Sequence, residues 1–188
     1  CRYKVSPKCP QPARQELHFA YQNGEKISPD VAFTAASTMK IPIMISTYRR
    51  VSEPAPASVT EMIELMIERS ENDPADRLME MVMDKNLGTL QLTDDMRALG
   101  LKNTFLAGYF YQGAPLLQRI ETPANKRLDV STNPDAYNQT TATEMGMVLD
   151  DLYQCSAEAH CQRCSLVKSA RMSANSCYPT WPRTASVF

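Results

Sequence analysis

The sequence predicts an α+β fold, and two observations support this prediction. Residues 16–22 alternate apolar and polar side chains and end at Asn23-Gly24, a pair typical of a type I′ turn. Residues 16–22 and 25–28 should therefore form a short β-hairpin. Beyond residue 36, apolar residues recur at the spacing of one helix face in several separate segments, which predicts a series of helices after the hairpin.

Residues typical of helix starts and helix ends delimit five expected helices. These are residues 37–50; a helix capped by Ser58, with Glu61 at the capping-box position, that ends before Ser70; a helix with Pro74 in its first turn that ends at Asn86-Leu87-Gly88; a short helix from Thr93 to Gly100; and a helix opened by the capping box Thr141-x-x-Glu144. Residues 101–140 contain several Gly and Pro residues and should be mostly irregular. A loop of this length is usually functional or disordered.

Composition bounds the class of protein. The 188 residues suit one domain or most of one, and 43% hydrophobic with 22% charged residues is ordinary for a globular chain. A net charge of -1 gives no argument for binding nucleic acid, and no apolar run is long enough to cross a membrane. The chain begins at Cys1 rather than Met, so we expect a processed chain or a fragment. We expect an extended arm over residues 1–15, a domain over 16–155 and an aberrant tail over 156–188.

The cysteines leave two possibilities open. The six are Cys1, Cys9, Cys155, Cys161, Cys164 and Cys177. Cys1 and Cys9 could pair in an oxidising compartment. His160-Cys161-x-x-Cys164 resembles half a zinc site, with Cys155 or Cys177 as a fourth ligand. This spacing fits no familiar zinc module, so we expect neither a metal nor a cofactor.

Ser37 and Lys40 form a Ser-x-x-Lys tetrad in front of an apolar run. Residues three apart lie on one helix face, so the hydroxyl and the amine can meet. A serine nucleophile needs such an amine within hydrogen-bond reach, and a helix N-terminus favours a developing negative charge. Desolvation near that positive end would lower the pKa of Lys40. The alternative is a Ser N-cap followed by an exposed Lys.

Two further motifs carry groups suited to acyl chemistry. Ser70-Glu71-Asn72 lies between two expected helices and supplies a second hydroxyl for relaying a proton and an amide for binding a carbonyl. Its alternative role is a helix N-cap. Glu121 and Asn125, in the long loop, can hold one water between a carboxylate and an amide, which is the arrangement of a general base. The alternative is a solvated loop Glu.

Ser-x-x-Lys, Ser-x-Asn and Glu-x-x-x-Asn, in this order, resemble the motifs of class A serine β-lactamases. The flanking segments add to the resemblance. They are Phe33-Thr-Ala-Ala-Ser-Thr-Met-Lys-Ile-Pro42, which is similar to the family's approach to the nucleophile, Ser70-Glu-Asn-Asp-Pro-Ala-Asp-Arg-Leu-Met79 and Leu99-Gly-Leu-Lys-Asn-Thr104. The resemblance covers roughly residues 17–155, and the motifs are specific in combination.

The resemblance implies a role for each of these residues. Ser37 would attack the carbonyl of a β-lactam ring to form an acyl-enzyme. Lys40, or Glu121 through its water, would take the proton of the hydroxyl. Ser70 would pass a proton to the lactam nitrogen, and Asn72 would hold the amide of the substrate's side chain. Glu121, with Asn125, would activate the water that releases the acyl group.

The resemblance also implies a fold and a setting. The family has a helical domain packed on an antiparallel sheet built from both chain ends. It implies a β-lactam or peptidoglycan-like small-molecule substrate, no cofactor and a role in antibiotic resistance. It further implies a bacterial protein that is exported to the periplasm, the medium or the cell surface. We expect a monomer without a membrane span and without nucleic acid as a partner.

The sequence departs from the family pattern in three ways. Glu71 replaces the usual Asp of the second motif. Only 33 positions separate Ser37 from Ser70, so part of the helical domain is trimmed, as in the compact serine-hydrolase relatives. No Lys-Thr-Gly or similar triad follows residue 155, and the triad's strand and the oxyanion-hole N–H after it would be missing. Losing one such donor typically costs ~10²–10³ in rate. We therefore expect a truncated domain with poor solubility, weak or no turnover, and one uncovered face on helix 37–50.

The tail could result from a frameshift. After Cys155 the sequence loses helical periodicity, yet a one-base slip over residues 174–188 permits an amphipathic helix ending in Asn-x-x-Gly, which resembles the family helix expected there. We interpret residues from about 160 onward as a frameshifted tail, which would leave its cysteines without a selected role. Codons that cannot spell that helix would refute this interpretation.

Two other functions stay open from the sequence. The chain could be a non-catalytic penicillin-binding or cell-wall interaction module that accepts an acyl group without turnover. It could also be a helical domain with no acyl chemistry at all.

Overall fold

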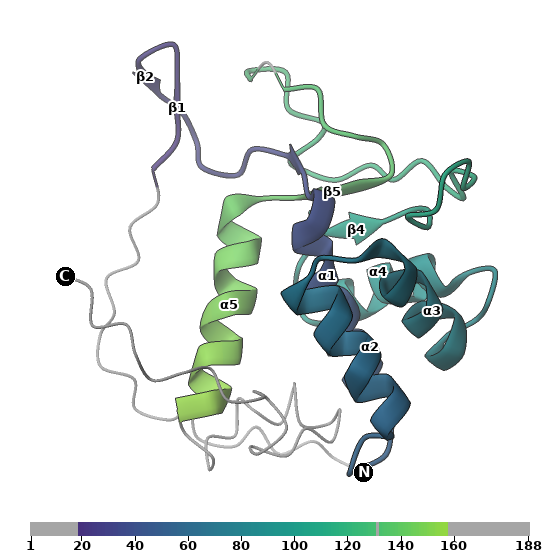
Figure 1. Ribbon diagram of the computed structural model, residues 1–188. Coiled ribbons are helices and arrows are strands. Elements are labelled where there is room, and N and C mark those ends of the chain that lie inside the picture. Colours follow the sequence, from purple (N-terminus) through teal and green to yellow (C-terminus); the bar gives the residue numbers. More distant parts are fainter. Residues whose placement is uncertain (1–18, 131, 158–188) are drawn as a thin grey trace, which may run out of the picture.

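The computed structural model describes residues 19–130 and 132–157. Within them the fold is α+β, with five α-helices and two small antiparallel sheets (Figure 1). The elements are β1 (Tyr21–Gln22), β2 (Glu25–Lys26), β3 (Phe33–Thr34), the 3₁₀ turn η1 (Ala36–Met39), α1 (Lys40–Tyr48), α2 (Ala57–Glu68), α3 (Asn72–Val82), α4 (Gly88–Ala98), β4 (Phe105–Leu106), β5 (Asn138–Thr140) and α5 (Ala142–Ala157).

The arm over residues 1–15 and nearly all of the tail lie outside the described residues. The same holds for His160 and for every cysteine except Cys155. The backbone of Cys155 lies in the last turn of α5, but its side chain is not described. The possible disulfide, the zinc hypothesis and the frameshift hypothesis therefore stay predictions.

The hairpin forms at the expected turn. β1 pairs antiparallel with β2, with Tyr21 opposite Lys26, and Asn23-Gly24 between them takes φ values of 53° and 85°. Both angles are the left-handed values that a type I′ turn requires. The strands are shorter than the expected 16–22 and 25–28, because only two residues on each side enter the ladder.

A second sheet joins β3, just before η1, to two strands in the segment 101–140, which the sequence predicted to be mostly irregular. Its strand order is β3-β5-β4, with Phe33 opposite Thr140 and Phe105 opposite Gln139. The strands have two or three residues each, which is too short for a period-two pattern to be visible in the sequence. Much of the remaining chain between residues 101 and 140 is irregular, as expected.

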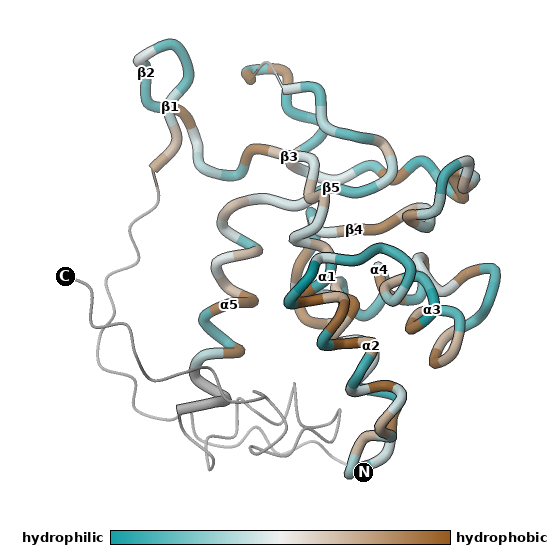
Figure 2. The backbone as a smooth tube through the Cα atoms, viewed as in Figure 1, coloured by the Kyte–Doolittle hydropathy of each residue, from teal (hydrophilic) through white to brown (hydrophobic). Residues whose placement is uncertain are grey.

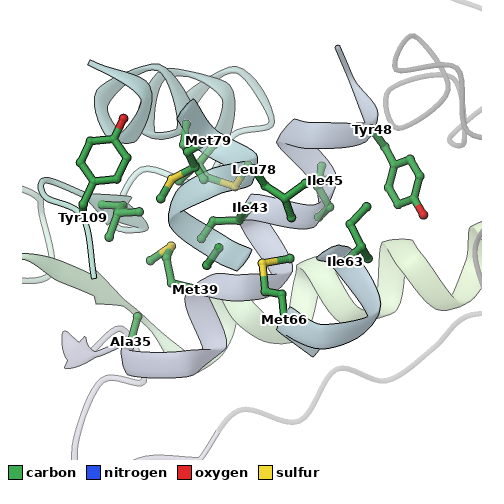
Figure 3. Packing of buried hydrophobic residues seen from close by; sticks show 14 of the residues in the cluster. Ala35, Met39, Ile43, Ile45, Tyr48, Ile63, Met66, Leu78, Met79 and Tyr109 are labelled. Atoms are coloured by element: carbon green, nitrogen blue, oxygen red, sulfur yellow. The ribbon is translucent and has the colours of Figure 1, made fainter. Parts of the chain in front are cut away.

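Helix α1 is the centre of the hydrophobic core. It packs against α2, α3 and α4, and Met39, Ile43 and Ile45 are completely or almost completely buried there (Figure 3). Figure 2 shows hydrophobic and hydrophilic residues alternating along α2 and α5, as expected for helices with one buried face. The expectation that one face of this helix lacks a cover is wrong. Ile41 and Met44 are half-buried and every other residue of α1 is buried, with α5 contributing Val148 to the same core.

Several helix boundaries differ from the predicted ones. Helix α1 begins at Lys40, after the turn η1, rather than at Ser37, and α3 ends at Val82 rather than at Asn86-Leu87-Gly88. Helix α2 begins at Ala57 after Pro56, without a side-chain cap, so Ser58 lies inside the helix rather than at its start. Helix α4 begins at Gly88 rather than at Thr93, since the Asp84 carboxylate accepts the N–H groups of Asn86 and Leu87 and turns the chain early. A Thr-Asp-Asp run is typical of an N-cap, but here the Thr93 hydroxyl bonds to β4 instead.

Other termini agree with the sequence. Pro74 lies in the first turn of α3, and Gly100 follows α4 with a φ of 90°, the left-handed value of a C-terminal glycine. Thr141 caps α5 by accepting the N–H of Glu144 at 3.2 Å. The carboxylate of Glu144 does not complete a capping box; it is buried against the N–H of Asn103 and the hydroxyl of Thr104. None of the helices within the described ranges is long and apolar enough to span a membrane.

Candidate functional site

Ser37 lies on the 3₁₀ turn η1, immediately before α1. Ala36, just before it, has a φ of 47°, which is unusual for a residue with a side chain, and its N–H donates to Asn138 Oδ1 at 2.6 Å. Positive φ outside glycine costs energy and clusters at functional sites, where neighbouring contacts hold it in place. Ser37 is exposed, whereas Met39 and Lys40, which follow it in the chain, are buried.

The amine of Lys40 joins three separate segments of the chain. Its side chain is only 2% exposed. Nζ lies 3.3 Å from Ser37 Oγ, 3.1 Å from Ser70 Oγ and 2.9 Å from Asn72 Oδ1. A fourth contact, at 2.5 Å, is with the backbone carbonyl of Ser70. The structure therefore brings together four of the six predicted site residues around one nitrogen atom.

Burial lowers the pKa of Lys40, since a charged ammonium loses its hydration there, while the negative charge of Asp76 acts in the opposite direction. The ring of Phe110 adds to the dry surroundings, with Nζ 5.7 Å from the ring centroid. An amine that gives up its proton more easily than a free lysine is what a general base requires.

Ser70 and Asn72 occupy the junction between α2 and α3. Ser70 has a φ of 57°, a left-handed conformation; its carbonyl accepts a hydrogen bond from Lys40, and its hydroxyl lies 3.1 Å from Nζ. Glu71, the residue that departs from the family motif, is the N-cap of α3 and makes no side-chain capping bond. The departure at Glu71 therefore leaves the contacts of Ser70 and Asn72 with Lys40 in place.

Glu121 and Asn125 have other partners. The Glu121 carboxylate forms an ion pair with Lys126 and its side chain is 73% exposed. Asn125 Oδ1 accepts the N–H of Thr122, while Nδ2 donates to Ile120 O and to Gln139 Oε1. Over residues 19–130 and 132–157, hydrogen bonds join Ser37, Lys40, Ser70 and Asn72, but neither residue of the Glu121 motif joins that network.

Three residues at the site escaped the sequence analysis. Asn138 holds the N–H of Ala36, Phe110 lies against Lys40, and Asp76 accepts the backbone N–H groups of Phe110 and Tyr111. Asn138 and Phe110 fall in a segment without periodicity, so nothing local indicates them. Asp76 carried a weak signal, because it stands on the buried side of α3 between Ala75 and the core residues Leu78 and Met79.

The described residues offer no cluster of three or more His, Cys, Asp or Glu side chains that could hold a metal ion. Comparisons with protein families, with curated proteins and with solved structures found no match to this chain. The geometry around Lys40 and the motifs of the sequence are therefore what indicates a function.

Proposed function

We propose that this protein is a serine hydrolase of the class A β-lactamase type, which opens a β-lactam amide through an acyl-enzyme on Ser37. The observation that supports the proposal most directly is the convergence of Ser37, Ser70 and Asn72 on the buried Lys40 amine. Chance could produce a single Ser-x-x-Lys contact along one helix. Contacts with a second motif 30 and 32 positions away are far less expected from chance.

The hydrogen bonds suggest how Lys40 acts. A neutral amine has two N–H groups and one lone pair, whereas an ammonium has three N–H groups and no acceptor. The short contacts with Ser70 O and Asn72 Oδ1 use two N–H groups. The lone pair is then left for the proton of the Ser37 hydroxyl, and burial of the amine favours this neutral form.

Acylation would follow from this arrangement. Ser37 Oγ attacks the lactam carbonyl carbon as its proton passes to Lys40, or to Glu121 through a water. The backbone N–H of Ser37, on the turn at the start of α1, would donate to the developing oxyanion. Ser70 Oγ, 3.1 Å from Lys40 Nζ, then gives its proton to the lactam nitrogen as the C–N bond breaks and regains a proton from the protonated Lys40 amine. Asn72 keeps its amide N–H groups for a carbonyl of the substrate's side chain.

Deacylation is the step that separates two candidate functions. In the hydrolase, Glu121 with Asn125 activates a water that attacks the acyl-enzyme ester. The ion pair of Glu121 with Lys126 and the contacts of Asn125 with Gln139 favour the second candidate, a penicillin-binding module that accepts an acyl group and keeps it. We propose a bacterial, exported location for either function.

A chromogenic cephalosporin distinguishes the candidates. Release of product beyond one equivalent per chain supports the hydrolase, and a single equivalent with a stable adduct on Ser37 supports the module. The Ser37→Ala variant is the control and should give neither product nor adduct. If wild type also gives neither, the proposed acyl chemistry is wrong.

A further inference from the structure

The segment Tyr109–Tyr111, which we call the aromatic loop, connects the core to the site. The Tyr109 side chain is buried in the core (Figure 3), while the ring of Phe110 is half-buried with Lys40 Nζ 5.7 Å from its centroid. Tyr111 stacks on Tyr109 with ring centroids 6.0 Å apart and is half-exposed. Phe110, which lies between the two tyrosines in sequence, is therefore the residue of this loop whose ring lies beside the Lys40 amine.

Hydrogen bonds fix the backbone of the aromatic loop at several points. The Asp76 carboxylate, 7% exposed, lies 2.9 Å and 3.1 Å from the Phe110 nitrogen and 2.9 Å from the Tyr111 nitrogen. The Tyr109 hydroxyl donates to Lys85 O at 3.0 Å, and Ala114 N–H donates to Tyr111 O at 3.1 Å. Burying a carboxylate destabilises the folded protein unless the carboxylate is well hydrogen-bonded. Here its hydrogen bonds go to the Phe110 and Tyr111 N–H groups, so they hold the backbone of Phe110 in place.

A ring held in this way is prepared to receive a ligand. Fixing an aromatic side chain before binding removes an entropy cost that a mobile ring would pay on association. Offset-stacked and edge-to-face contacts between rings add to the burial of apolar area. A second ring against Phe110 would also shield the Lys40 amine from water.

We propose that Phe110 is a specificity-determining residue, which receives an apolar and preferably aromatic substituent on the acyl group that Ser37 accepts, and that Asp76 is the residue that positions it. This inference rests on the proposed acyl chemistry and adds a substrate class to it. The preferred substrate carries an aryl group next to an amide, with the amide at Asn72 and the aryl group at Phe110.

Equilibrium binding to the Ser37→Ala variant tests the inference without any turnover. The two probes are benzylpenicillin and 6-aminopenicillanic acid, which share the bicyclic lactam and differ in the phenylacetyl group. By calorimetry, we expect benzylpenicillin to bind at least about tenfold more tightly, since ring contacts and apolar burial supply that much. Adding Phe110→Ala should lower this ratio to about one to twofold while leaving the weaker probe's affinity nearly unchanged.

Two further variants separate contact from folding. Tyr111→Ala removes the neighbouring ring, which packs on Tyr109 rather than against Lys40, and should keep the ratio. Asp76→Ala should lower the ratio as Phe110→Ala does, whereas Asp76→Asn, which retains one oxygen acceptor for the loop, should restore most of it. Equal affinities of the two probes, no binding of either, or a ratio that Phe110→Ala leaves unchanged would overturn the inference. Absence of acylation in wild type with the ratio intact would instead refute the proposed function alone.

Discussion

At the scale of one residue, burial of Lys40 lowers the pKa of its amine and so favours its proposed role as a base. Its amine is enclosed yet has four oxygen atoms within 3.3 Å, so the side chain is held in one position. The spacing of Ser37 and Lys40 predicted that the two could meet. The motif resemblance grouped Ser70 with them, but the contact with Phe110 could not be predicted, because Phe110 is distant in sequence and belongs to no motif.

Replacing the amine tests its role as a base. Lys40→Met keeps much of the side chain's length and apolar stem but cannot take a proton from Ser37. We expect acylation by a chromogenic cephalosporin to slow by at least about 10², the lower end for loss of a general base. The exposed Lys102 gives the matched control, and Lys102→Met should acylate at the wild-type rate. An unchanged rate in Lys40→Met would point to a base elsewhere.

Asp76 should make stability depend on pH. Burial raises the pKa of this carboxyl above its ordinary value of 3.8, although the Phe110 and Tyr111 N–H groups lower it in part. A raised folded-state pKa means that the contribution of Asp76 to stability is fully present below 3.8 and is lost as pH rises through the folded-state pKa.

Asp76→Asn removes this titration. Relative to wild type, the variant should therefore gain stability between about pH 4 and about pH 7, whatever the cost of the altered hydrogen bond. Urea unfolding of both proteins at both pH values measures the difference, and titration of all other groups cancels. A difference that is constant with pH, or that moves against the variant, would contradict the assignment.

At the scale of elements, the parts of the fold set by local sequence could be predicted, and the parts set by long-range contacts could not. Helix positions followed from apolar spacing, and the Asn23-Gly24 turn and the Gly100 terminus followed from backbone conformations that these residues favour. The strands β4 and β5 could not be predicted, since each is held by partners far along the chain rather than by its own pattern. The predicted helix start at Thr93 was wrong for the same reason, because its hydroxyl binds the backbone of β4 instead of capping a helix.

Thr93 completes the edge of the sheet. The hydroxyl accepts the N–H of Leu106 at 2.9 Å and lies 2.9 Å from the Leu106 carbonyl oxygen, the two groups of β4 that β5 does not use. Thr93→Val keeps the shape and leaves both backbone groups buried without this partner, which should destabilise the protein by about 1–3 kcal/mol. Urea unfolding measures the loss. Thr60→Val on α2, which removes a hydroxyl from a less buried position, should cost much less.

At the scale of the whole molecule, apolar surface remains on α5. Leu149 is 49% exposed and Tyr153, one turn on, is 57% exposed. Exposed apolar surface promotes association, and the expected poor solubility stays a prediction.

A single charge should reduce that tendency. Leu149→Lys should raise the concentration at which light scattering first detects aggregates, since it places a charge within the exposed apolar stripe of α5. Ile67→Lys, on the exposed side of α2 where 40% of the residue is accessible, controls for the added charge alone. Equal improvement by both variants would mean that net charge, and not the α5 surface, limits solubility.

The central claim is that Ser37 accepts an acyl group with the help of the amine one turn along. Acid-quenched intact mass measurement after brief exposure to benzylpenicillin tests it most directly. We predict a single adduct of the mass of the penicillin, mapped by digestion to the peptide that contains Ser37, absent in Ser37→Ala and slow to form in Lys40→Met. An adduct on any other residue, or none at any exposure time, would contradict the account.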